Sequence, residues 1–325
     1  MRRVREFIDG IDLRKFRFWI QLGAFVLFVY GGYLAIDLGR EIPIFSCGYN
    51  DQHGGMCYFM PLQHQLARPW DRLFSAASLG VLSGFFFFLL WFIIFNKAWC
   101  GYFCPLGTLQ DWITVLRKRL AIPYGRYSKV QFFALKKVKY IFLAIVLLFP
   151  LLIGAGFLDG EWRAAFCKMC PGRVITPMFV GDFSQWAIDF SSKTALFLTA
   201  FGVAFTALFF VGSFIKKRFF CFFCPMSAMH YIFSPFALLR LKKDGAKCTK
   251  CGDCYHVCDM QIFDIADDVK SKNILRDDCI LCLKCVAACP EEDALHLDIV
   301  DMAIFRSTKG GFAKRMGIDL KEEVG

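Results

Sequence analysis

CTKCGDCYHVC at residues 248–258 and CILCLKCVAACP at residues 279–290 are the most informative stretches of this sequence. Both carry four cysteines in the order C-x2-C-x2-C-x3-C, the spacing of bacterial proteins that bind two iron–sulfur clusters. Three thiolates of one run reach one cluster, and the fourth crosses to the other. The spacing therefore predicts two interleaved [4Fe-4S] sites, the first formed by Cys248, Cys251, Cys254 and Cys289 and the second by Cys279, Cys282, Cys285 and Cys258.

Zinc is the alternative interpretation of these cysteines, because tetrahedral four-cysteine zinc sites also use closely spaced pairs. A zinc ion needs only four thiolates, which gives no reason for two successive runs that both end in a three-residue gap. Iron–sulfur clusters are therefore favoured. Asp259 departs from the usual pattern, in which proline follows the fourth cysteine. Its negative charge predicts a more negative reduction potential for the neighbouring cluster.

The residues that precede these motifs have the composition of a membrane protein. The chain of 325 residues is 57% hydrophobic and 21% charged, with a mean hydropathy of +0.46. An interrupted apolar run at 231–241 contains Pro235 and is too short to span, so an interfacial helix is expected there. Four almost uncharged stretches are long enough to cross a bilayer as helices, namely residues 18–36, 73–95, 140–158 and 195–215.

These two parts define the expected fold class. We expect a membrane α-helical protein with four transmembrane helices, followed by a C-terminal α+β ferredoxin domain of the bacterial two-cluster type. The expected divisions are a cytoplasmic N-terminal segment at 1–17, a transmembrane domain with cysteine-bearing loops at 18–241, and a cytoplasmic 2×[4Fe-4S] domain at 242–325.

Positive charge is distributed unevenly around the four stretches. Lys and Arg number 22 in residues 1–17, 96–139 and 216–247, against seven in the loops 37–72 and 159–194. Because cytoplasmic loops are positive, both termini are expected in the cytoplasm, with the chain in a bacterial inner membrane. The same rule accounts for the net charge of +11, so nucleic acid is not an expected partner.

Eight further cysteines fall in the loops of the membrane domain. The inner set is Cys100, Cys104, Cys221 and Cys224, and the outer set is Cys47, Cys57, Cys167 and Cys170. The inner set is open to three interpretations: a third iron–sulfur cluster, a copper or zinc site, and reduced thiols with a redox role. The outer set could form a further cluster or disulfides, since its compartment is oxidising. The order of spans and cysteine pairs repeats once, which indicates a duplicated two-helix unit.

The histidines offer few candidates for a quinone-binding site. His53 and His64 stand in an outer loop, where quinol oxidation needs a proton acceptor. His230 closely follows the Cys224 motif and is a third candidate, with a packing role as its alternative. No histidine directly follows a cysteine pair, so covalent haem is not expected. The sequence identifies no catalytic residue.

These features resemble a known family, the NapH-type membrane polyferredoxins, which are quinol dehydrogenase membrane components that serve periplasmic nitrate reductase. The resemblance rests on the four spans, the cytoplasmic termini, the motifs Cys104-Pro105 and Cys224-Pro225, and the two cluster motifs of the tail. Related proteins are the membrane part of the nitrous oxide reductase regulator and the copper reductase of cytochrome oxidase assembly. Two features depart from the family pattern: the second motif has two residues between its cysteines instead of three, and the outer cysteines are not part of the pattern.

The resemblance implies that the chain passes electrons between the quinone pool and partner redox proteins, as an oxidoreductase component of the quinol dehydrogenase type. Expected cofactors are two clusters in the tail and one or two further clusters at the membrane faces, with quinone as substrate. Other iron–sulfur proteins or cytochromes are the expected partners. A copper-handling or copper-reducing assembly factor is one alternative, although only 36 residues follow Cys289. A redox-sensing scaffold subunit is the other.

Overall fold

The protein is described by a computed structural model that covers residues 12–34, 57–70, 79–276 and 278–316. The apolar helix α4 (Leu79–Phe95) is shorter than a full span, and the predicted span at 73–95 begins outside the described residues. Within the described ranges three helices are long and apolar enough to cross a membrane: α2 (Leu13–Tyr30), which continues as a short 3-10 turn to Leu34, α6 (Lys129–Gly154) and α9 (Lys193–Ile215).

These three helices begin earlier than the apolar stretches predicted, because capping residues lie upstream of the hydrophobic segments. The Asp12 carboxylate accepts a hydrogen bond of 3.0 Å from the N–H of Arg14, which starts α2 at Leu13 instead of residue 18. Ser128 forms a capping box with Gln131 and starts α6 at Lys129 instead of residue 140. Polar first turns therefore extend the apolar helices beyond the hydrophobic signal.

The segments between the long helices fold back into the bundle as short helices. Phe59, Phe166 and Ile175 of these segments are only 2%, 4% and 1% exposed. These side chains therefore belong to the core of the helical body. The short elements are α3 (Phe59–Leu66), α7 (Ala165–Met169) and α8 (Pro171–Met178), and, near the other ends of the long helices, the π-turn η4 (Trp99–Phe103), α5 (Pro105–Arg119), the 3-10 turn η7 (Phe219–Phe222) and α10 (Pro225–Ile232).

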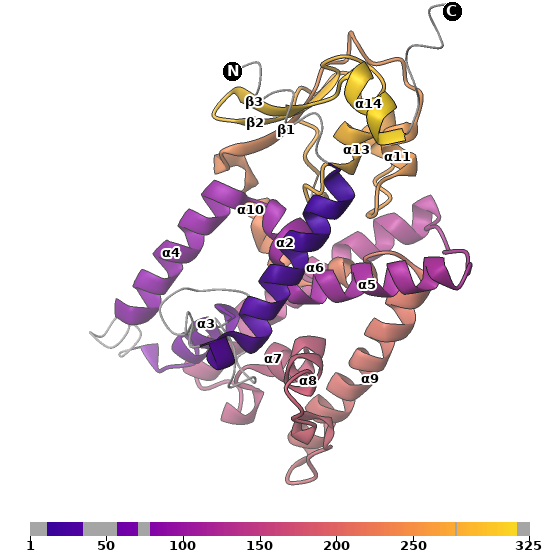
Figure 1. Ribbon diagram of the computed structural model, residues 1–325. Coiled ribbons are helices and arrows are strands. Elements are labelled where there is room, and N and C mark those ends of the chain that lie inside the picture. Colours follow the sequence, from indigo (N-terminus) through magenta and orange to yellow (C-terminus); the bar gives the residue numbers. More distant parts are fainter. Residues whose placement is uncertain (1–11, 35–56, 71–78, 277, 317–325) are drawn as a thin grey trace, which may run out of the picture.

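The C-terminal part forms a separate small sheet with short helices packed around it. The three strands are antiparallel in the order β1-β2-β3, with Leu241 opposite Leu297 and Leu297 opposite Phe305. Figure 1 shows the sheet, α11, α13 and α14 together at the upper end of the molecule, away from α3, α7 and α8. The elements are β1 (Leu239–Lys243), α11 (Asp253–His256), α12 (Asp264–Asp267), α13 (Lys284–Ala287), β2 (Leu295–Ile299), β3 (Met302–Arg306) and α14 (Lys309–Met316).

The prediction of an interfacial helix at 231–241 is wrong. Helix α10 ends at Ile232, a 3-10 turn follows at Ser234–Phe236, and the strand β1 begins at Leu239. The side chains of this strand alternate between buried and more exposed, so its apolar residues face the core of the C-terminal sheet instead of a lipid surface. The sheet therefore begins three residues before the expected division at 242.

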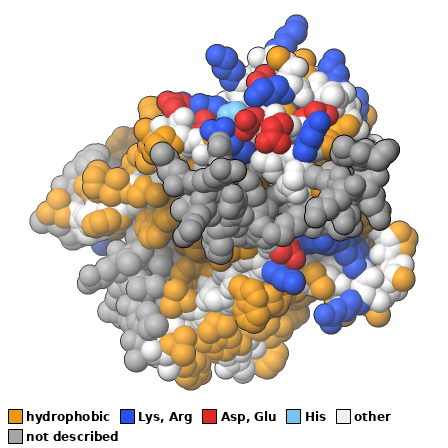
Figure 2. Space-filling model, turned by 45° about the horizontal axis from the view of Figure 1, so that its top comes forward, with side chains coloured by type: hydrophobic (Ala, Val, Ile, Leu, Met, Phe, Trp, Pro, Cys, Tyr) orange, Lys and Arg blue, Asp and Glu red, His pale blue; other side chains and the backbone are white. Residues whose placement is uncertain are grey.

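The C-terminal unit packs directly on the helical body. Leu13 of α2 and Phe132 of α6 share one hydrophobic core with Ile280 of the tail. A buried ion pair joins the same surfaces, with 2.6 Å between Lys139 Nζ of α6 and Asp278 Oδ1. Figure 2 shows charged side chains gathered over the C-terminal unit and hydrophobic side chains over the lower body, as expected for one polar and one lipid-facing part.

Candidate metal centres

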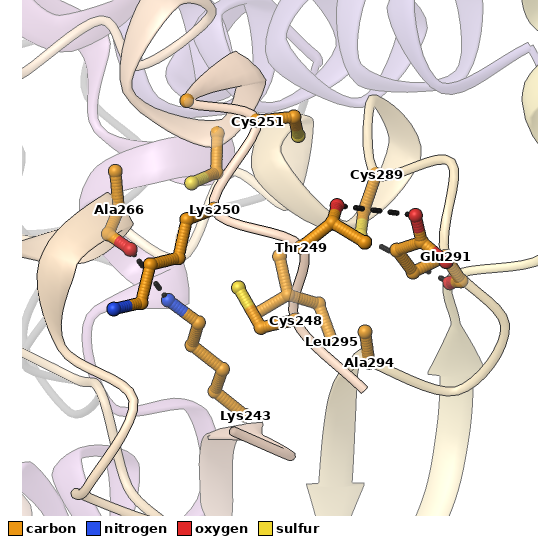
Figure 3. Close-up of a pocket in the computed structure, with 12 residues that line it drawn as sticks. Lys243, Cys248, Thr249, Lys250, Cys251, Ala266, Cys289, Glu291, Ala294 and Leu295 are labelled. Carbon is orange, nitrogen blue, oxygen red and sulfur yellow. Dashed lines mark hydrogen bonds between the residues drawn. The ribbon is translucent and has the colours of Figure 1, made fainter. Parts of the chain in front are cut away.

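The first tail cavity, of about 20 Å³, lies between the loop at 248–254 and Cys289. Its cysteines are Cys248, Cys251, Cys254 and Cys289. Gly252 adopts φ +86° and caps α11, a left-handed turn that glycine accommodates without strain, and this turn lets the loop wrap the cavity. Figure 3 shows Lys243 beside this cavity, where its ammonium donates hydrogen bonds to the carbonyls of Ile265 and Ala266 at 2.9 and 3.0 Å.

The second tail cavity, also about 20 Å³, is enclosed by apolar side chains that include Leu241 and Met260. Leu281 and Leu283 both adopt left-handed backbone conformations and bend the loop around the cavity. The N–H of Leu281 donates a hydrogen bond of 3.4 Å to Cys279 Sγ. Backbone N–H groups aimed at thiolate sulfur are a known influence on cluster potential. The cysteines of this cavity are Cys258, Cys279, Cys282 and Cys285.

Each tail cavity combines three cysteines of one run with the fourth of the other, which is the arrangement that interleaved cluster sites require. In the described ranges no group of three or more His, Cys, Asp or Glu residues is placed so that it could hold a metal ion. A mononuclear zinc site needs four thiolates within about 2.3 Å of one ion. The interleaved grouping of the cysteines therefore fits two iron–sulfur clusters better than zinc, and the ligand sets stay predictions.

A third cavity, of about 120 Å³, lies inside the helical body. Its lining mixes the two sets that the sequence placed at opposite membrane faces, and that separation is wrong. The reason is that α3, α7 and α8 fold back toward the centre of the bundle and carry their cysteines with them. The described cysteines that line this cavity are Cys57, Cys100, Cys104, Cys167, Cys170 and Cys224.

The remaining membrane-domain cysteines are placed as follows. Cys221 lies beside the cavity, 4.0 Å from Gln110 Nε2 and within electrostatic range of Cys104 and Cys224. Cys57 and Cys170 are free thiols, so the disulfide alternative finds no support at these two positions. Cys47 lies outside the described residues.

The two candidate histidines within the described residues, His64 and His230, lie in different elements. His230 is buried against Phe92, with 3.9 Å between ring centroids, and His64 is exposed in α3. Neither lines the cysteine cavity of the helical body. His53 lies outside the described residues, so the quinone-site hypothesis for these residues stays a prediction.

The second tail cavity lies against the cysteine motif of the helical body. A Cβ atom at Gly101 would come within 2.3 Å of the Ile280 carbonyl oxygen, so only glycine allows this approach. The Tyr102 hydroxyl donates a hydrogen bond of 3.3 Å to the carbonyl of Cys282. The segment that follows Cys100 thus touches the loop that carries Cys282.

A buried charge network supports this contact. Arg17 of α2 donates hydrogen bonds to the carbonyl of Gly101 at 3.0 Å and to Asp111 at 2.6 Å. Arg218 bridges the Cys100 carbonyl, at 2.8 Å, to the same Asp111 carboxylate. Burial by itself raises the pKa of Asp111, but Arg17 and Arg218 outweigh it and hold the pKa below its ordinary value.

Asp259, which stands in place of the usual proline, is part of this network. Its carboxylate pairs with Arg17 at 3.2 Å and with Lys217 at 3.6 Å, both from the helical body, and with Lys284 of the tail. Burial by itself would raise the pKa of Asp259. The surrounding cations Lys284, Arg17 and Lys217 have the larger effect and hold the pKa well below its ordinary value. The sequence identified the departure at Asp259 and missed its partners, because the positive residues near the spans were already explained by membrane orientation.

Asp259→Asn should loosen the tail from the helical body. Removing one partner of a buried ion pair leaves uncompensated charge and costs about 3–5 kcal/mol. Hydrogen exchange of the tail in the full chain measures the free energy of opening. In the wild type, the stabilisation that the Asp259 carboxylate provides is fully present above the pKa of an aspartate in the unfolded chain, about 3.9. It is lost as the pH falls toward the pKa of Asp259 in the folded protein, because folding lowers that pKa.

The control for this variant is Asp301→Asn, since Asp301 pairs with Lys242 at 2.7 Å but its side chain is 75% exposed. An exposed pair contributes little. Equal protection in the two variants would show that Asp259 does not hold the tail in place.

Comparison with known proteins gives a consistent result. A 4Fe-4S binding domain matches residues 78–123 and again residues 198–243, and a 4Fe-4S dicluster domain matches residues 240–290. The repeated match is what a duplicated two-helix unit predicts. No solved structure matches the chain.

Several curated proteins are similar to the chain. Ferredoxin-type protein NapH of Haemophilus influenzae is 27% identical over 210 residues, which are 63% of each chain. The uncharacterized protein MJ0750 of Methanocaldococcus jannaschii is 30% identical over 206 residues, or 62% of this chain and 72% of that one. YccM of Escherichia coli, whose name marks it as a candidate electron transport protein, is 23% identical over 215 residues, or 65% of this chain and 54% of that one. The chain thus spans less than two thirds of the first and third of these relatives.

Cysteine-lined cavities, apolar helices and the two domain matches define an iron–sulfur electron-transport protein with helices suited to a membrane. More narrowly, the chain belongs to the NapH-type membrane polyferredoxins.

Proposed function

We propose that this chain is a four-span protein of the bacterial inner membrane that carries electrons between the quinone pool and partner redox proteins. Both termini lie in the cytoplasm, since the positive loops are on that side. The division into an N-terminal segment, a membrane domain and a cytoplasmic tail follows from this topology. Iron–sulfur proteins or cytochromes are the proposed partners.

The tail provides two cluster sites. Cys248, Cys251, Cys254 and Cys289 form one ligand set, and Cys258, Cys279, Cys282 and Cys285 form the other. Iron–sulfur clusters supply one-electron redox chemistry when they are bound. The chain's own residues position the two sets and shield the second from water, since Cys279, Cys282 and Cys285 are all buried.

One observation carries the proposal: the loop of the second tail site rests on the segment that follows Cys100. The Ile280 carbonyl packs against Gly101, which has no side chain to block it. The Tyr102 hydroxyl donates a hydrogen bond to the Cys282 carbonyl. Arg17 donates one to the Gly101 carbonyl. Cysteines of the membrane body and of the tail thus belong to adjoining sites. Such a sequence of adjoining redox sites supports transfer between lipid-soluble quinol and a water-soluble partner.

The first tail site is the proposed exit toward the partner. Cys251 is exposed, and the loop carries Lys250 at its surface. The second site has no exposed cysteine, and its loop contacts the helical body at Gly101 and Tyr102. A partner would therefore exchange electrons at the first site.

Quinol added anaerobically to the full chain in lipid vesicles should bleach the visible absorbance of its iron–sulfur clusters. Each quinol carries two electrons, so the extent of bleaching should rise with added quinol until the clusters are reduced. Oxidised quinone is the matched control and should cause no bleaching. An unchanged spectrum after quinol addition would contradict the proposal, and tight copper binding by the membrane cysteines in the same sample would favour the copper-handling alternative.

A further inference from the structure

Three cysteines of the helical body share the same local structure. Each is followed by proline, which occupies the first turn of a helix, and each adopts an extended conformation that caps that helix. The φ and ψ angles are −63° and 118° at Cys104, −70° and 131° at Cys170, and −74° and 115° at Cys224. The sequence assigned two of these residues to one membrane face and one to the other, so their common geometry was not expected.

Cys57 completes the group, although no proline follows it. It precedes Tyr58, which caps α3, and its carbonyl accepts a hydrogen bond of 3.2 Å from the N–H of Met60. It stands two residues before its helix, whereas the other three stand directly before theirs, and each of the four helices has at least eight residues. The four helices are α3, α5, α8 and α10.

All four thiols meet at one cavity, of about 120 Å³. Cys57 and Cys170 are within electrostatic range of each other and of Cys104. Cys224 is likewise within range of Cys104. The cavity of each tail site, which four cysteines line, has a volume of only about 20 Å³. The body cavity therefore has room for a group of the same size.

The same four cysteines stand at the N-terminal ends of the helices that follow them. Their carbonyls accept hydrogen bonds from N–H groups of the first turn, namely Met60 for Cys57 at 3.2 Å, Thr108 for Cys104 at 2.9 Å, Arg173 for Cys170 at 3.0 Å and Ser227 for Cys224 at 3.1 Å. Unbonded N–H groups and the dipole make a helix N-terminus favourable for negative charge. Four such ends around one cavity create a site suited to an anionic group held by thiolates.

The tail provides an internal comparison. Cys279, which the ferredoxin spacing assigns to a cluster, also lies against a backbone N–H group, since its Sγ accepts a hydrogen bond of 3.4 Å from the N–H of Leu281. The other cysteines of the body differ. Cys221 contacts the side chains of Arg218 and Gln110, and Cys167 Sγ accepts from Gln63 Nε2 at 3.0 Å.

We propose that Cys57, Cys104, Cys170 and Cys224 bind a third iron–sulfur cluster, of the [4Fe-4S] type, inside the helical body. This ligand set replaces the separate inner and outer sets, since it takes two cysteines from each. The inference rests on the proposed function, because it names the ligands of one site on the proposed electron path. Cys100 also lines this cavity, and both Cys100 and Cys221 pack against the hydrophobic core that contains Cys279 and Cys282.

Iron and acid-labile sulfide per full chain test this ligand set, together with EPR spectra of the reduced protein. The wild type should hold about twelve irons, the sum for three four-iron clusters. Cys57→Ala and Cys170→Ala should each fall to about eight and lose the same EPR component, while both tail signals persist. Those tail signals show that the variant has folded.

Cys167→Ala is the matched control, three residues from Cys170 in the same cysteine pair, and should keep about twelve irons. Where an alanine variant loses its tail signals, Cys170→Ser provides the decisive reading, since an oxygen ligand should shift one EPR component and leave the others unchanged. About eight irons in the wild type would overturn the inference, as would full iron content in Cys57→Ala and Cys170→Ala. A chain with about twelve irons that quinol fails to reduce would instead refute the proposed function alone.

Discussion

Cys258→Ala should abolish the tail cluster that lies nearest to the helical body and leave the other tail cluster in place. Cys258 is the last cysteine of the first run in the sequence, yet it lines the cavity of Cys279, Cys282 and Cys285. Three thiolates do not complete a four-cysteine site, so about four irons per chain should be lost. EPR of the reduced full chain should show the loss of the same component as in Cys285→Ala.

Cys254→Ala is the control for this result, because Cys254 lies four residues earlier in the same run but lines the other cavity with Cys289. Cys254→Ala should remove the EPR component of the cluster that Cys289 lines and leave the component that Cys258→Ala removes. If Cys254→Ala and Cys258→Ala removed the same component, the two ligand sets would follow the sequence order and would not be interleaved.

Gly101→Ala should slow electron transfer between the helical body and the tail while all clusters are retained. The new Cβ would meet the Ile280 carbonyl at 2.3 Å and the Cys282 Cα at 3.6 Å, so the tail loop must move. Overpacking of this kind costs about 1–3 kcal/mol. A displaced loop lengthens the path between the helical body and the tail cluster, and the rate of electron transfer falls as that distance grows. The rate of tail reduction after quinol addition measures the effect.

Gly23→Ala is the matched control, since a Cβ at this position in α2 has no atom within 4 Å. It should leave the rate unchanged. A Gly101→Ala protein with full iron content and the wild-type rate would show that electrons do not pass through this contact.

The grouping of the tail cysteines around two cavities was predictable, because cysteine spacing encodes spatial proximity. Two intervening residues form one tight turn, so Cys279, Cys282 and Cys285 can face one cavity whatever surrounds them. The long helices were predictable from hydropathy alone, but their starts were not. Their caps, Asp12 and Ser128, lie in polar sequence that carries no hydrophobic signal.

The membrane cysteines were harder to place, because the prediction assumed that each loop stays on its own side of the bilayer. Nothing in the hydropathy of residues 159–194 shows that α7 and α8 fold back and bury Phe166 and Ile175. The motif Cys170-Pro171 was the one available signal, since it repeats the Cys104-Pro105 pattern on the loop assigned to the opposite face.

The charge network was also hidden, because its members are far apart in the sequence. Asp111 lies 94 residues from Arg17 and 107 from Arg218. Lys and Arg near spans have a sufficient explanation in membrane orientation, so no pattern marked these two as buried partners. The contact between the body and the tail is therefore a result of the three-dimensional arrangement alone.

Freeze-quench EPR after quinol is mixed with the fully oxidised chain in lipid vesicles tests the electron path most directly. Cys258→Ala and Cys254→Ala first assign one EPR component to each tail cluster. We then expect the component of Cys258, Cys279, Cys282 and Cys285 to gain electrons before that of Cys248, Cys251, Cys254 and Cys289, with Gly101→Ala delaying both. Two results would contradict an electron path from the membrane body into the tail. One is reduction of the cluster of Cys248, Cys251, Cys254 and Cys289 before the other tail cluster, and the other is that quinol reduces neither cluster.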